Sequence, residues 1–113
     1  TLLGSAAARL HNHLGLVLSE LGDYQDAIQH YQLAIVIDEN LLGKDAPDLA
    51  VDFNNLAMGY LDLGDFKKAL YWLEERALKL QLAKLPHNHP QLAVTYSNIG
   101  EVYSENGNYT KAR

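Results

Sequence analysis

One short phrase occurs three times along this chain of 113 residues, at nearly constant spacing. Leu21-Gly22-Asp23-Tyr24 returns as Leu63-Gly64-Asp65-Phe66 and again as Asn106-Gly107-Asn108-Tyr109, so the glycines lie 42 and then 43 residues apart. A second phrase, Pro47-Asp48-Leu49-Ala50-Val51, recurs as Pro90-Gln91-Leu92-Ala93-Val94 after another 43 residues. Self-similarity at this period indicates stacked supersecondary units, which form a solenoid with one long surface rather than a single catalytic pocket.

Each repeat is predicted to form two antiparallel helices joined by a short turn. In the middle repeat, the apolar residues between positions 49 and 61 fall at steps of three and four, which places them on one helical stripe. Gly64 is suited to end that helix because glycine adopts the left-handed conformation easily. Asp65 is suited to cap the following helix. We expect Asp45 to cap the first helix of this repeat, with Pro47 in its first turn.

The same pattern extends in both directions from the middle repeat. It predicts helices over about residues 6–21 and 24–42, and a third pair that begins with a helix over about 90–105 and barely starts its partner at Tyr109. We therefore expect one all-α array of antiparallel helix pairs over residues 1–113, with about two and a half repeats. The repeats are predicted to cover about residues 6–46, 47–89 and 90–113.

Two registers of the repeat carry only small residues. Small side chains let two helix axes approach closely, so a bulky residue in either register would be overpacked. The small residues are Gly15, Ala57 and Gly100 in one register and Ala27, Ala69 and Ala112 in the other.

The second repeat contains one extra residue within its second helix. The step from Ala27 to Ala34 is seven residues, whereas the matching step from Ala69 to Ala77 is eight, so the insertion falls within residues 70–76. One additional residue turns the rest of an ideal helix by about 100°. Either a π-bulge absorbs the insertion, or Ala77 packs elsewhere than Ala34 does. We expect a modest local bulge or shift.

These phrases resemble the tetratricopeptide repeat. That family carries a Leu-Gly/Ala pair in its first helix, an aromatic residue three positions later, a Gly before a polar residue and an aromatic at the turn, and an Ala in the second helix. Leu56-Ala57, Tyr60, Gly64-Asp65-Phe66 and Ala69 match that order. The long period is similar to the branch typified by kinesin light chains. The resemblance implies a right-handed α-solenoid that works as a scaffold for protein–protein interaction.

In that family the first helices of successive repeats line a concave groove, along which peptides lie. Carried over by register, the resemblance implies that the ladder His13, Asn55 and Asn98 contacts a peptide, because an amide offers a donor and an acceptor together. The alternative is that these side chains bond neighbouring helices or water. The residues predicted to bind peptide are Asn12, His13, Leu16, Asn54, Asn55, Met58, Asn98 and Glu101.

The charge along this groove indicates the kind of ligand it accepts. Some relatives clamp a C-terminal carboxylate with Lys and Arg, but apart from Asn55 the matching positions here differ from that clamp: Asn12, Leu16, Val94 and Asn98. Acidic residues are expected along the groove instead: Glu20, Asp62, Glu101 and Glu105. We expect a peptide with basic residues beside apolar anchors. The alternative is that a chain of net charge −5 shows acidic groups on most faces.

Other functions find little support in the sequence. The net charge of −5 disfavours nucleic-acid binding, and no apolar run approaches the ~18 residues of a membrane span. We expect no enzyme, since no nucleophile–base pair, phosphate-binding loop or paired buried carboxylates stands out. His11 and His13 point apart on a helix, and His87 and His89 lack a third ligand, so we expect neither metal nor cofactor. With no cysteine, the cytoplasm is the simplest expected location.

The second half of the chain carries features of a different kind. Trp72 is expected to pack between neighbouring helices, and residues 74–76 are expected to form a solvated helix face. The helix that begins near residue 90 is expected to expose Tyr96, Ile99 and Tyr103. Such an uncovered end favours self-association by stacking or swapping. The alternative function is therefore a structural or oligomerisation module whose groove is not used.

Overall fold

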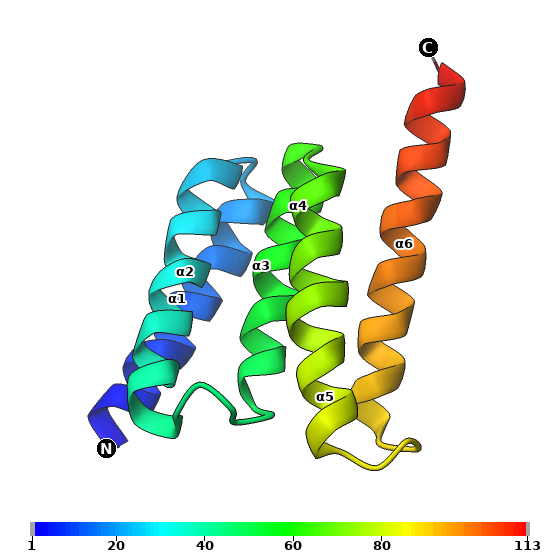
Figure 1. Cartoon of the computed structure of the whole chain (residues 1–113). Helices are drawn as coiled ribbons and strands as arrows, with labels where there is room; N and C mark the ends of the chain where they lie inside the picture. Colours follow the sequence, from blue (N-terminus) through cyan, green and yellow to red (C-terminus); the bar gives the residue numbers. More distant parts are fainter. Residues whose placement is uncertain (1, 113) are drawn as a thin grey trace.

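A computed structural model shows the chain as a row of packed helices (Figure 1), without a strand in the part of the chain that it describes. It describes the backbone of residues 2–112 and the side chains of residues 3–107. The elements are α1 (Leu2–Glu20), α2 (Tyr24–Leu42), α3 (Leu49–Leu63), α4 (Phe66–Leu70), the π-helix η1 (Tyr71–Leu78), α5 (Lys79–Lys84) and α6 (Pro90–Ala112).

The helices pair as the repeats predict. α1 packs antiparallel against α2, and α3 packs antiparallel against the continuous helix formed by α4, η1 and α5 (Figure 1). α6, the first helix of the third repeat, lies along that continuous helix and also contacts α3. The molecule measures 48 × 34 × 18 Å, and the shortest dimension corresponds to about two helix diameters. The described residues thus form a slab one helix pair thick, as a solenoid does.

Two glycine turns connect the paired helices in the same way. Gly22 has φ +87° and Gly64 has φ +86°, a region that other residues rarely adopt. The amide of the next residue then donates back to the preceding helix, from Asp23 to the carbonyl of Leu18 at 2.8 Å and from Asp65 to the carbonyl of Tyr60 at 2.9 Å. The predicted turns at both glycines are confirmed.

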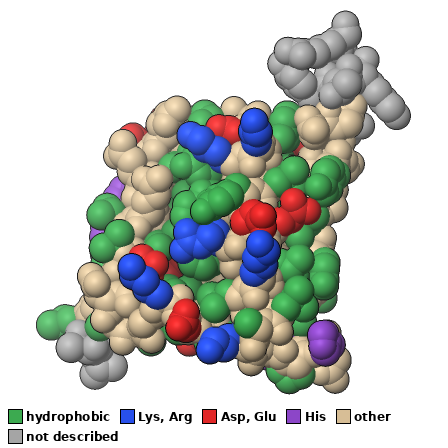
Figure 2. All heavy atoms as spheres, viewed as in Figure 1, with side chains coloured by type: hydrophobic (Ala, Val, Ile, Leu, Met, Phe, Trp, Pro, Cys, Tyr) green, Lys and Arg blue, Asp and Glu red, His purple; other side chains and the backbone are tan. Residues whose placement is uncertain are grey.

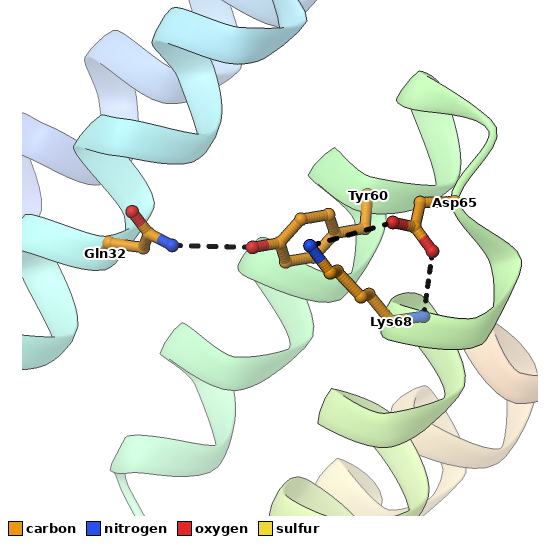
Figure 3. Close-up of polar contacts among 4 residues, drawn as sticks. All are labelled: Gln32, Tyr60, Asp65 and Lys68. Atoms are coloured by element: carbon orange, nitrogen blue, oxygen red, sulfur yellow. Dashed lines mark hydrogen bonds and ion pairs between the residues drawn. The ribbon is translucent and has the colours of Figure 1, made fainter.

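The second turn is held further by side chains (Figure 3). The carboxylate of Asp65 accepts a 3.1 Å hydrogen bond from the backbone N–H of Lys68, so the predicted cap is confirmed. The ammonium of Lys68 lies 3.9 Å from Asp65 and 5.4 Å from the ring centre of Tyr60. Gln32 of α2 donates a 3.4 Å hydrogen bond to the hydroxyl of the same tyrosine. The turn is therefore tied to the preceding repeat.

The prediction that Asp45 caps the next helix is wrong. α3 begins at Leu49, after Pro47 rather than with it, and Asp45 lies exposed in the loop. Backbone hydrogen bonds replace a side-chain cap here: Ala50 N donates to Pro47 O at 3.0 Å, and Leu49 N donates to Ala46 O at 3.1 Å. These two bonds satisfy amide groups that a helix start otherwise leaves without partners.

The small residues pack as predicted in the first two repeats. Ala27, Ala57 and Ala69 are fully buried. A Cβ added at Gly15 would come 2.8 Å from Cδ1 and Cζ of Tyr31 and closer still to Cε1. Gly100 is different, because a Cβ there would meet nothing within 4 Å. The close-packing prediction is wrong at that position, since no second helix of the third repeat lies against it in the described structure.

The extra residue of the second repeat is absorbed by a π-helix. Residues Tyr71–Leu78 form η1, in which hydrogen bonds span one residue more than in an α-helix. The longer turn brings Ala77 back to full burial, as Ala34 is in the first repeat. The predicted bulge is confirmed, and it extends over eight residues.

The third repeat departs from the prediction. α6 continues through residues 106–108 to Ala112, without the expected turn, so no second helix starts at Tyr109. Continuing the helix keeps its backbone hydrogen bonds, and within the described residues no second helix of the third repeat packs against α6 to favour a turn instead. The side chains of Tyr109 and Ala112 lie outside the described part.

The exposed face of α6 also differs from the prediction. Tyr96 and Tyr103 are 52% and 53% exposed, as expected. Ile99, however, is partly buried against the cluster that contains Leu73 and Val102. The expectation that Ile99 is exposed is wrong, because α6 turns this residue toward the preceding helix pair.

The junction between the first two repeats is covered by an aromatic residue and an arginine. Trp72 packs against the core, with its ring 5.5 Å from that of Phe53, as predicted. The guanidinium of Arg76 lies 4.8 Å from the ring centre of Phe53 and 5.0 Å from that of Trp72. The expectation of a solvated face at residues 74–76 is therefore wrong for Arg76, and Glu74 accepts a 3.3 Å hydrogen bond from the hydroxyl of Tyr103.

The face seen in Figure 2, where α2 and α4 stand in front, mixes basic and acidic side chains without a patch of one sign. Within residues 2–112, no helix is long and apolar enough to span a membrane.

Candidate functional site

Two hollows of equal size, each about 290 Å³, lie where the first helices of successive repeats meet. The first hollow lies between α1, the end of α2 and the start of α3, and the second lies between α3, α5 and α6. The first hollow is lined by Ser5, Ala8, Arg9, Asn12, Asp38, Leu41, Leu42, Asp48, Val51 and Asp52. The second hollow is lined by Val51, Asn54, Asn55, Met58, Gln81, Gln91, Val94 and Asn98.

The two hollows are the same feature in successive repeats. Five lining residues of the first hollow each have an equivalent that lines the second hollow, 42 or 43 residues further along the chain. These positions pair Arg9 with Val51, Asn12 with Asn54, Asp38 with Gln81, Asp48 with Gln91, and Val51 with Val94. The geometry therefore repeats while the chemistry changes, from charged residues in the first hollow to amide and aliphatic residues in the second.

The floor of the first hollow contains a buried carboxyl group. Asp52 is 3% exposed, and its Oδ1 accepts a 2.9 Å hydrogen bond from Nδ2 of Asn12. Its Oδ2 and the Oδ1 of Asn12 are buried and have no hydrogen-bond donor among the described residues. Burial, and next the neighbouring carboxyl of Asp38, raise the pKa of Asp52 to about 7, which the bond from Asn12 only partly offsets. The sequence did not indicate this pair, in which a buried carboxyl, Asp52, lies beside the partly buried carboxyl of Asp38.

The floor of the second hollow is a chain of neutral hydrogen bonds. Asn98 donates to Oδ1 of Asn54 at 2.9 Å, and Asn54 donates to Oγ1 of Thr95 at 3.0 Å. Thr95 donates to Oε1 of Gln81 at 2.6 Å, and Gln81 donates to the carbonyl of Gln91 at 3.3 Å. This chain joins α3, α5 and α6 by groups that satisfy one another, which fixes how the repeats stack.

Two larger hollows lie nearer the turns. One of about 340 Å³ lies between α1 and α3 and is lined by Leu16, Ser19, Glu20, Tyr24, Tyr31, Met58 and Asp62. Burial is the main cause that raises the pKa of Asp62 there. The other, of about 730 Å³, is a broad open depression between the α3–α4 turn and Asn106 on α6. We place no site in the larger one, because it holds no buried polar group.

Comparison with known proteins identifies the architecture. Residues 6–77 match the sequence profile of the tetratricopeptide repeat, which is more than half of the chain. The chain belongs to the tetratricopeptide repeat family. The crystal structure of a Podosopora anserina putative kinesin light chain with TPR-like repeats superposes with a TM-score of 0.79, at 22% identity over 96% of this chain and 51% of that one. The predicted solenoid fold and its long-repeat branch are thus confirmed.

Two curated relatives are much longer than the segment that this chain matches. A Clustered mitochondria protein homolog from Danio rerio is 33% identical over 82 residues, which is 73% of this chain but 6% of that protein. Protein KINESIN LIGHT CHAIN-RELATED 3 from Arabidopsis thaliana is 27% identical over 102 residues, 88% of this chain and 15% of that protein. This tetratricopeptide repeat chain therefore spans a small part of these two relatives.

The residues predicted to bind peptide fall into three groups. Met58 and Asn55 line the second hollow, and Asn55 makes no side-chain hydrogen bond within the described structure. Asn12, Asn54 and Asn98 line the hollows as well, but their amides bond neighbouring helices. Leu16 lines the hollow near the turn, whereas His13 and Glu101 are exposed and line none of the hollows described above: the first, the second and the two nearer the turns.

Three of the five histidines, His11, His30 and His89, make polar contacts in the described part of the chain. Nδ1 of His11 lies 2.9 Å from Nδ1 of His30 on α2, while His13 points to solvent, so the predicted divergence of the two α1 histidines is confirmed. Nδ1 of His89 accepts a 3.1 Å hydrogen bond from the backbone N–H of Gln91 at the start of α6. Among the described residues, no three His, Asp or Glu side chains are arranged to hold a metal ion.

Sequence reasoning missed four residues that line the hollows or form the hydrogen bonds beneath them. Asp38 and Gln81 come from second helices, and Thr95 and Asp52 lie one turn before the predicted asparagines. A signal for the first pair exists: each follows the buried alanine of its helix, Ala34 or Ala77, by four residues. A polar residue one turn beyond a buried alanine lies on the same helical face, which points it toward the next repeat.

Proposed function

We propose that this chain binds a linear peptide segment of a partner protein along the face formed by α1, α3 and α6, as an adaptor module. The observation that carries the proposal is the second hollow. Val51 and Val94 line it and are about half exposed, Met58 lines it as well, and the amide of Asn55 has no partner in the described structure. Apolar walls with one unpaired amide suit an aliphatic side chain and an adjacent peptide group.

Rigid helices support this function energetically. The buried hydrogen bonds from Asn98 through Thr95 to Gln81 hold α3, α5 and α6 in place without a ligand. A groove that is ordered before binding leaves most of the ordering cost to the peptide, which favours recognition of a short extended segment.

A peptide-array screen tests the proposal. The wild-type chain is compared with Asn55→Ala and with Gln29→Ala, a matched change of an exposed amide on α2. Peptides retained by wild type and Gln29→Ala but lost by Asn55→Ala support binding in the groove. The proposal is contradicted if Asn55→Ala retains the same peptides as wild type while all three proteins are equally helical. Asn98→Ala is unsuitable as the main test because it removes a donor to Asn54.

A second candidate function is self-association through α6. Its support is the exposure of Tyr96 and Tyr103 on α6, which are 52% and 53% exposed even though the hydroxyl of Tyr103 donates to Glu74 of η1. Aromatic side chains of this size commonly lie at protein interfaces. Sedimentation velocity of the wild type beside Tyr96→Lys tests it. A concentration-dependent dimer that Tyr96→Lys abolishes supports this function, and a monomer at high concentration rules it out.

A further inference from the structure

We infer that the ligand of this groove presents a basic side chain, Lys or Arg, to the first hollow and an aliphatic side chain to the second, roughly three residues away along an extended peptide. This inference rests on the proposed function and adds the chemistry of the partner. It follows from the register that the two hollows share and from what differs between them.

The first hollow lacks hydrogen-bond donors where it holds buried acceptors. Oδ1 of Asn12 has no donor within the described structure. Once Asp52 is ionised its Oδ2 has none either, because the neighbouring carboxyl of Asp38 is another acceptor and only the protonated form of Asp52 shares a hydrogen bond with it. Buried acceptors without a donor cost free energy that a donor from outside recovers. In the second hollow, the neutral groups at the matching places satisfy one another through Thr95 and Gln81.

The charges facing the first hollow favour a cation. Asp38 comes from α2, Asp48 from the residue before α3 and Asp52 from α3, and they face one basic residue, Arg9 from α1. Arg9 forms no ion pair with an acidic residue in the described structure and stays exposed. A Lys or Arg side chain of a peptide supplies several N–H donors and a positive charge in the same group.

The lining of the second hollow favours an aliphatic side chain of the peptide. No charged residue lines it, and Val51, Met58 and Val94 present aliphatic surface there. Val51 lines both hollows, so one peptide that passes over it reaches both.

The distance between the hollows sets the spacing of the two anchors. Packed helix axes lie about 8–10 Å apart. An extended chain advances about 3.3–3.6 Å per residue, so the basic and aliphatic anchors are separated by roughly three residues.

The test is an array of nonapeptides in which Arg, Lys, Glu or Leu is fixed at one position and Leu or Ser at a second, with separations of one to six residues. We expect Arg and Lys with Leu at a separation near three to give the strongest signal. For the best fluorescein-labelled peptide, Asp38→Asn should weaken binding roughly tenfold or more and Arg9→Gln should strengthen it. Asp45→Asn, an exposed loop carboxylate, is the matched control.

A pH series gives a second readout. Because the pKa of Asp52 is raised to about 7, a cationic ligand must displace its proton below that pH, so binding of the Arg peptide should strengthen from pH 6 to 8. Asp52→Asn should remove that rise.

The outcomes separate the two proposals. Peptides that bind through Asn55 without a preference for Arg or Lys, or whose binding is unchanged in Asp38→Asn, overturn this inference and leave the proposed function standing. An array on which the wild-type chain retains no peptide overturns both.

Discussion

The side-chain amide of Asn12 donates a 2.9 Å hydrogen bond to the carboxyl of Asp52, 40 residues further along the chain. The equivalent bond in the next repeat runs from Asn54 to Thr95 at 3.0 Å. Each bond joins the first helices of two successive repeats at the floor of a hollow. The same side chains therefore hold successive repeats together and determine the chemistry of the groove.

The first prediction concerns the stability of the first junction as a function of pH. The pKa of Asp52 is raised in the folded protein to about 7 from its ordinary value of 3.8, so the native state binds the proton more tightly. Its contribution to stability is full below the unfolded pKa and is lost as pH rises through about 7. Asp52→Asn carries no charge to bury and should raise Tm at pH 8 by roughly 4 °C, about 1 kcal/mol for a domain of this size.

Circular-dichroism melts at pH 5, 6, 7 and 8 measure this effect. The advantage of Asp52→Asn over wild type should shrink as the pH falls, while Asp45→Asn should follow wild type throughout. Parallel curves for the wild type and Asp52→Asn would show that the buried carboxyl does not titrate in this range.

The second prediction concerns the neutral network. Thr95→Val keeps the shape of the side chain but removes the hydroxyl, so Oε1 of Gln81 loses its donor and Nδ2 of Asn54 loses an acceptor. We expect a cost of about 1–3 kcal/mol in urea denaturation. Adding Gln81→Leu should recover part of that cost, because no unpaired acceptor then remains. Ser97→Ala, an exposed change on the same helix, should lie close to wild type, and an equal loss there would point to helix propensity instead.

The third prediction compares two glycines in the same register. Gly15→Ala should cost about 1–3 kcal/mol, because its Cβ would overlap the ring of Tyr31. Gly100→Ala should stabilise by about 0.5–1 kcal/mol, because nothing lies within 4 Å and alanine favours the helix. Thermal melts of both variants measure these changes in stability. Equal effects of the same sign would mean that the close contact with Tyr31 does not govern this register.

The fourth prediction concerns the π-helix. Deleting Glu75, an exposed residue of η1, restores the seven-residue step to Ala77 that the first repeat has at Ala34. The shortened protein should fold with a regular α-helix and lose about 1 kcal/mol or less. Deleting Leu33, an exposed residue of the regular helix α2, should instead rotate Ala34 out of the core and unfold the first repeat. Far-ultraviolet circular dichroism and thermal melts compare the helicity and stability of the two deletion variants. Similar losses of stability in both would contradict the interpretation that η1 accommodates one inserted residue.

The periodic features of the fold could be predicted from the sequence because each depends on local chemistry. Gly22 and Gly64 end helices through a left-handed turn, and the eight-residue step to Ala77 requires a longer helical turn wherever the repeat lies. The failed prediction of a turn at residues 106–108 concerns a feature that needs a partner helix. The local phrase there is similar, but within the described residues no second helix of the third repeat packs against α6, and α6 continues to Ala112.

The candidate site was only partly predictable for a related reason. A single repeat shows which residues lie on a first helix, and that placed Asn12, Asn55 and Met58 on the groove. The hollows, however, form between repeats, where Asp38 or Gln81 arrives from a second helix. Only the stacked structure shows that Asn54 is hydrogen-bonded to the neighbouring helix while the adjacent Asn55 is not.

The measurement that tests the groove most directly is a heteronuclear NMR titration of the ¹⁵N-labelled chain with the strongest peptide from the array. We expect the largest shift changes at the side-chain amide of Asn55 and along α3 and α6 around Val51 and Val94, with α2 nearly silent except at its end near Asp38, which lines the first hollow. Changes confined to α2 and α4, or to the exposed tyrosines of α6, would contradict a peptide-binding groove.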